Sequence, residues 1–154
     1  WSLSRVSDGN DVDRQLVRQM TVLSQGNDQY FRFVTRLSRA MEVKAAGGTP
    51  DLAPAQQALD NMSKKLAEMK AISPGPMDEK VSAQVISTWQ ALLDQGVTPQ
   101  MAQAKQATLE GYRQHANNVT PPLSRAFGSA AENFNNTAAT RSTARAWWST
   151  ASPA

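Results

Sequence analysis

Residues 16–41, LVRQMTVLSQGNDQYFRFVTRLSRAM, carry the pattern that decides the fold. Large side chains return at spacings of four and three, which is the seam of a coiled coil or of a long bundle helix. We therefore expect a first helix over about residues 11–46, about 54 Å long at 1.5 Å per residue, which Gly47 and Gly48 end. The seam, in which Asn27 is the one polar member, consists of Leu16, Met20, Leu23, Asn27, Tyr30, Val34, Leu37 and Met41.

Thr-Pro dipeptides divide the rest of the chain. A threonine can cap a helix and a proline suits its first turn, so each of Thr49-Pro50, Thr98-Pro99 and Thr120-Pro121 marks a helix start. Each remaining segment has one apolar stripe, and none alternates with period two as a strand would. We predict an all-α antiparallel up-and-down four-helix bundle, one domain over residues 1–154. Its later helices are expected at about 50–72, 77–118 with a break near 96–99, and 121–147.

The composition offers little catalytic chemistry. The chain has no cysteine and one histidine, so multi-histidine metal sites are excluded, and no nucleotide-binding or protease motif is present. We expect no catalytic residues, no metal and no cofactor. A net charge of +3 is too small for a nucleic-acid binder, so no nucleic-acid partner is expected. The chain begins at Trp1 without a methionine, and we expect it to be a segment of a longer protein.

Three arginines stand out in the first predicted helix. Arg32, Arg36 and Arg39 fall within an arc of roughly 60° at about 100° per residue, and no acid occurs between Gln29 and Met41. Guanidinium groups are planar forks suited to carboxylate or phosphate, so an anion site is one interpretation and a solvated basic face is the other.

Two phenylalanines flank this arginine face. Phe31 and Phe33 would have nothing to cover them on a wholly solvated surface. We therefore expect the helix to pack on its flanks as well, for instance against a second copy of the chain.

A second polar group of residues precedes the last predicted helix, in the stretch YRQHANNVTPP over residues 112–122. If Thr120 caps that helix, the free backbone N–H groups beside it favour an anion. Tyr112, His115 and Asn118 would add neutral hydrogen bonds. The alternative is that Thr120 only caps its own helix, that Tyr112 belongs to the core and that His115 is a surface residue.

In this layout the sequence resembles the periplasmic sensor domain of bacterial methyl-accepting chemotaxis receptors of the aspartate and serine type, over about residues 8–145. The resemblance rests on TRLSRA in the first helix, STWQALL in the third and TPPLSRAFGSAAENF at the start of the fourth. It implies a bundle between two membrane helices that dimerises through the first helix. It also implies a ligand at the dimer interface, held by first-helix arginines and by the start of the fourth helix.

Arg39 is the firmest match to that family and Thr120 the next. The family's arginines are five and four residues apart, whereas Arg32, Arg36 and Arg39 are four and three apart. Only Arg39 aligns cleanly, and the residues before Thr120 also depart from the family pattern.

The expected function is that of a homodimeric periplasmic sensor domain of an inner-membrane chemoreceptor, with flanking transmembrane helices in the full-length protein. Its ligand would be a di- or tricarboxylate such as malate or citrate, with an aromatic acid as the next choice. One alternative is the sensor domain of a histidine kinase; the other is a helical scaffold whose arginines meet acidic residues of a protein partner. The expected ligand-binding residues are Arg39, Arg36, Arg32, Thr120, Tyr112, His115 and Asn118.

Overall fold

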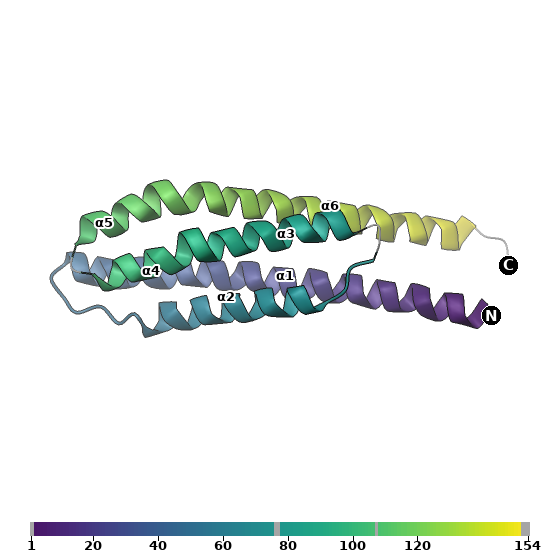
Figure 1. Ribbon diagram of the computed structural model, residues 1–154, viewed down its shortest axis with the longest axis horizontal. Helices are drawn as coiled ribbons and strands as arrows, with labels where there is room; N and C mark the ends of the chain where they lie inside the picture. Colours follow the sequence, from purple (N-terminus) through teal and green to yellow (C-terminus); the bar gives the residue numbers. More distant parts are fainter. Residues whose placement is uncertain (1, 76–77, 107, 152–154) are drawn as a thin grey trace.

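The protein is a bundle of four antiparallel helical rods (Figure 1). The computed structural model describes residues 2–75, 78–106 and 108–151, with side chains over 14–75, 78–106 and 108–140. Within these ranges every regular element is helical, which confirms the predicted all-α four-helix bundle. The elements are α1 (Ser2–Ala45), α2 (Ala53–Ala71), α3 (Glu79–Ala91), η1 (Leu92–Val97), α4 (Thr98–Lys105), α5 (Leu109–Gln114), η2 (His115–Val119) and α6 (Thr120–Ala151).

The first rod is α1 and the second is α2. The third runs without interruption through α3, η1 and α4, and the fourth through α5, η2 and α6. The start of α1 and the end of α6 lie at the same end of the bundle, and the α4–α5 connection lies at the other (Figure 1). The first and last rods therefore run in opposite directions.

The end of α1 follows from its two glycines, as predicted. Gly47 has φ +87°, a left-handed conformation that glycine adopts without steric cost. Gly48 N–H donates to the Val43 carbonyl at 2.9 Å, and Gly47 N–H donates to the Lys44 carbonyl at 3.0 Å. This pair of bonds is the Schellman motif, which satisfies carbonyls that the helix end leaves without partners.

The core follows the predicted seam of α1 with one addition. Leu16, Leu23, Tyr30, Leu37 and Met41 are buried among side chains of the other rods, while Met20 and Val34 are partly buried. The expectation that both phenylalanines lie on the flanks was wrong for one of them. Phe33 is fully buried in the core of its own chain, whereas Phe31 is 62% exposed.

Trp89 of α3 lies at the centre of the core against the backbone of α1. A Cβ built on Gly26 would come within 2.1 Å of the Trp89 ring, so only glycine allows this approach. The indole also packs on Phe127 of α6, with ring centroids 5.4 Å apart. This contact joins three of the four rods at one level.

None of the three Thr-Pro dipeptides marks a helix start in the structure. α2 begins at Ala53 rather than at 50, with Pro54 in its first turn and no side-chain cap. Thr98-Pro99 and Thr120-Pro121 lie inside continuous rods, and the chain is instead extended at Gln106 and Thr108. The third rod ends at Lys105 rather than near 118, and the last begins at Leu109 rather than 121.

A π-helical turn precedes Pro99 and another precedes Pro121. Proline lacks an N–H and clashes with the carbonyl four residues earlier, and the wider turns of η1 and η2 fall just where that clash would occur. A local sequence pattern that marks helix starts cannot distinguish a start from a proline accommodated in this way.

Candidate functional site

A groove of about 600 Å³ lies between the first and last rods, near the α4–α5 connection. Tyr112 and Thr120, two of the predicted ligand-binding residues, lie on its wall. From α1 the groove is lined by Tyr30, Val34, Ser38, Met41, Glu42 and Ala45. From α4 to α6 it is lined by Gln100, Leu109, Tyr112, Arg113, Ala116, Asn117, Thr120, Pro121, Ser124 and Arg125.

The floor of the groove is a chain of polar side chains from four helices. Thr120 Oγ1 donates to Gln100 Oε1 at 2.6 Å, and both residues are buried. Burial raises the pKa of the Tyr112 phenol, while side-chain hydrogen bonds from Gln100 and Ser38 partly lower it. The chain Thr120, Gln100, Tyr112 and Ser38 ties α6, α4, α5 and α1 together.

Thr120 therefore does not have the role that the sequence suggested. Its backbone is helical, with φ −68° and ψ −41°, because α6 continues from η2 without a new start. No free N–H groups of a helix start lie beside it, and its hydroxyl proton is given to Gln100. What Thr120 offers a ligand is a hydroxyl oxygen able to accept.

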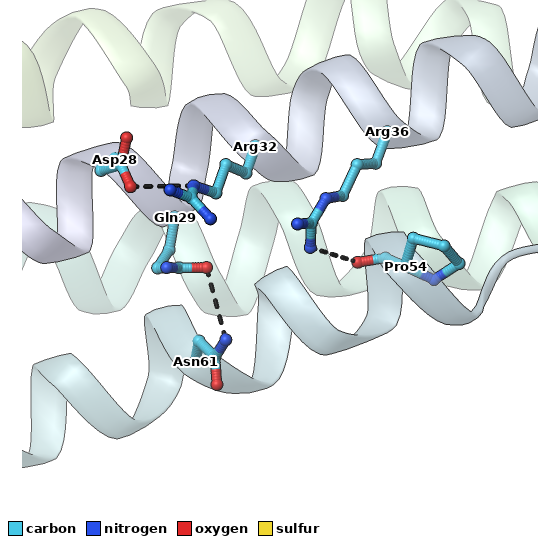
Figure 2. A network of polar contacts seen from close by, with 6 residues as sticks. All are labelled: Asp28, Gln29, Arg32, Arg36, Pro54 and Asn61. Carbon is cyan, nitrogen blue, oxygen red and sulfur yellow. Dashed lines mark hydrogen bonds and ion pairs between the residues drawn. The ribbon is translucent and has the colours of Figure 1, made fainter.

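The first-helix arginines lie outside the groove. Arg32 Nε pairs with Asp28 Oδ2 at 2.9 Å, one turn earlier on α1 and one residue before the acid-free stretch. Arg36 Nη1 donates to the Pro54 carbonyl of α2 at 3.1 Å, and Figure 2 shows both contacts. The interpretation of Arg32 as a guanidinium without an acid was therefore wrong. Arg39 is exposed and does not line the groove.

His115 and Asn118 lie beside a separate, smaller hollow of about 320 Å³, which Gln103 also lines. The His115 ring Nε2 donates to the Gly96 carbonyl at 2.8 Å, which joins the two π-helical turns η2 and η1. This bond gives the histidine a structural partner. The structure thus does not bring His115 or Asn118 together with Tyr112 and Thr120.

Three charged residues of the groove were not among the predicted ligand-binding residues. Glu42, Arg113 and Arg125 line it, and none of them has an ion pair within the described part of the chain. The sequence signal for Arg113 and Arg125 is a helical face whose positions recur every three or four residues from 109 to 125. The expected helix start at 121 divided that face and concealed it.

The comparisons agree with this architecture. A family model described as "Tar ligand binding domain homologue" matches residues 3–142. A solved structure, the N-terminal ligand-binding domain of a protein described as a methyl-accepting chemotaxis protein from Salmonella enterica, is 65% identical with a TM-score of 0.82. That match covers 85% of this chain and 97% of the other. No protein among the curated sequences matches.

Bundle, groove and comparisons together define a ligand-binding sensor domain of a chemoreceptor, a class that is not enzymatic. The chain belongs to the family of Tar ligand-binding domain homologues. The resemblance noted in the sequence is thereby confirmed. Among the described residues, none of the helices is both long and apolar enough to cross a membrane.

Proposed function

We propose that this domain lies in the periplasm and senses a small organic anion that binds in the groove between α1 and the α5–η2–α6 rod. The ligand would be a carboxylate, either a di- or tricarboxylate such as malate or citrate, or an aromatic acid. The observation that carries the proposal is the presence of two arginines, Arg113 and Arg125, in the groove without an acid paired to either one. Guanidinium groups form charge-assisted, bidentate bonds with carboxylates.

The remaining wall of the groove suits the carbon body of such an acid. Val34, Met41 and Leu109 supply apolar surface, and the Tyr112 ring adds an aromatic face. The polar floor supplies hydroxyl and amide groups that fix orientation, which is the usual division of labour in small-molecule sites. At about 600 Å³ the groove also has room for an acid larger than malate.

We further propose that the domain forms a homodimer through α1. Val17 and Phe31 are 60% and 62% exposed, and they lie two heptads apart on one face of the helix. Large apolar side chains on an exposed helix face suit contact with a second copy. Arg39 lies about 100° around α1 from Ser38 of the groove, so it would serve at the edge of such an interface rather than inside its own groove.

The groove is placed where a ligand can influence the bundle ends. Its walls belong to α1 and to the rod that ends in α6, and both helices reach the same end of the bundle. Flanking membrane helices in the full-length protein would continue from that end. A ligand drives signalling only if it binds two arrangements of these helices unequally, for example before and after a small shift of α6.

Calorimetric titration of the domain with organic acids, amino acids and aromatic acids at two salt concentrations tests the proposal. We expect selective binding within one acid class, weaker at high salt because the contacts are ionic. Absence of binding across the panel would favour the rival function, a helical scaffold for a protein partner.

A further inference from the structure

The charged residues of the groove are separated along its length. Ser38 of α1 is hydrogen-bonded to Tyr112 of α5, so these two residues lie at the same level along the bundle. Because the helices are antiparallel, Glu42 lies toward the start of α5, on the same side as Arg113. Arg125 lies beyond Thr120, toward the other end of the groove.

The two groove arginines are far apart. They are separated by 12 positions on one continuous rod, about 18 Å at 1.5 Å per residue. Helical side chains slant toward the N-terminus of their own helix, so both guanidinium groups are displaced in the same direction and stay widely separated. A four-carbon acid such as malate is too short to reach both of them.

Between the two ends the groove is neutral. On the last rod, the groove residues between Arg113 and Arg125 are Ala116, Asn117, Thr120, Pro121 and Ser124, and Val34 of α1 lies opposite them. None of these side chains is ionisable. The middle therefore suits an uncharged carbon chain or ring.

We propose that the groove selects an elongated organic diacid, with one anionic group bound by Arg125 and the other by Arg113. This inference rests on the proposed function, because it refines the ligand of the same groove. It assigns the ionic contacts to arginines of α5 and α6 rather than to Arg32 and Arg36, whose guanidinium groups already have partners in the chain.

The two ends are not equal. Glu42 lines the Arg113 end and opposes a second negative charge there, whereas the lining residues around Arg125 are Pro121 and Ser124, neither of which is acidic. Arg125 is therefore the main anchor, and Arg113 is the weaker one. Glu42 lowers the affinity of the Arg113 end for an anion. The second anionic group of the ligand must therefore reach Arg113 without approaching the Glu42 carboxylate.

Titration with a series of unbranched α,ω-dicarboxylates, from succinate to sebacate, tests this inference by calorimetry. We expect affinity to rise with chain length toward an optimum among the longer members. For the best diacid, Arg125→Gln should weaken binding by about tenfold or more, since a bond between two charged groups is lost. Arg113→Gln should weaken binding less, and Glu42→Gln should strengthen it.

Arg18→Gln is the matched control, because Arg18 is exposed on α1 and lies outside the groove. Circular dichroism checks that each variant retains its helix content. If succinate or malate bound as tightly as the long diacids, or if Arg125→Gln matched Arg18→Gln, the inference would be overturned while the sensor function stood. If no acid bound the unmodified domain, the proposed function itself would fail.

Discussion

The arginines of α1 and those of the last rod contain the same functional group in different surroundings. Arg32 is paired with Asp28, and Arg36 is bound to a carbonyl of α2. Arg113 and Arg125 line a groove without an ion pair of their own. The difference shows that clustering of arginines along a sequence does not locate an anion site. The proposed anion site rests instead on guanidinium groups that the fold leaves unpaired beside a hollow.

Two double variants separate these arginine pairs most strongly. Arg113→Gln with Arg125→Gln should lower the affinity for the best-binding acid by about a hundredfold, because two charge-assisted contacts are removed. Arg32→Gln with Arg36→Gln should change it less than about threefold, since neither guanidinium reaches the groove. Calorimetry on both variants measures the contrast. The reverse ranking would return the site to the arginine face of α1.

Thr120→Val probes the floor beneath the groove arginines. The change keeps the side-chain shape but leaves the buried Gln100 oxygen without its donor. Such an unsatisfied group costs about 1–3 kcal/mol, so the free energy of unfolding in urea should fall by that amount. Thr137→Val is the control, because its hydroxyl bonds only to the Asn133 carbonyl one turn earlier on an exposed stretch of α6. Equal losses in both variants would show that the floor adds nothing to stability.

The Tyr112 phenol predicts how stability depends on alkaline pH. Its pKa is raised above 10.0 in the folded protein by burial, so folding favours the neutral phenol. The contribution of the neutral phenol to stability is complete below the pKa that Tyr112 has in the unfolded chain. It is lost as the pH rises through the pKa that Tyr112 has in the folded protein. The free energy of unfolding should therefore fall above about pH 10, and less steeply in Tyr112→Phe. An identical slope in that variant would contradict a buried phenol at the groove floor.

The smallest effect is expected for the ion pair on α1. Arg32 and Asp28 are more than half exposed, and exposed pairs contribute about 0–1 kcal/mol. Arg32→Ala should thus leave the thermal midpoint nearly unchanged. Any small decrease in the midpoint should disappear in high salt, which screens the ion pair. A drop of several kcal/mol in the free energy of unfolding would mean that Arg32 makes a buried contact.

The helical seam was sufficient to predict the fold. The spacing from Leu16 to Met41 identified a long bundle helix, and Gly47 with Gly48 located its end, because both signals depend on neighbours within a few residues. The predicted boundaries at Thr98-Pro99 and Thr120-Pro121 failed for a physical reason. A π-helical turn that absorbs a proline has no sequence pattern distinct from that of a helix start.

The candidate site was only partly predictable. Tyr112 and Thr120, which lie in one polar stretch of sequence, both line the groove. Gln100 and Ser38 were not predicted, since each meets them through packing between different rods. The roles of Tyr112, Thr120, Arg39, His115 and Asn118 in ligand binding remain predictions. Among them, Arg39 has an exposed position that suits contact with a second subunit.

Protection of a single thiol tests most directly whether a ligand occupies the groove. The chain has no cysteine, so Ser124→Cys places one reactive thiol on the groove wall, and Ser87→Cys places one on the exposed face of α3. The best-binding acid should slow alkylation of the Ser124→Cys variant in proportion to its occupancy and leave the Ser87→Cys variant unaffected. Unchanged alkylation of Ser124→Cys at saturating acid would contradict the groove as the binding site.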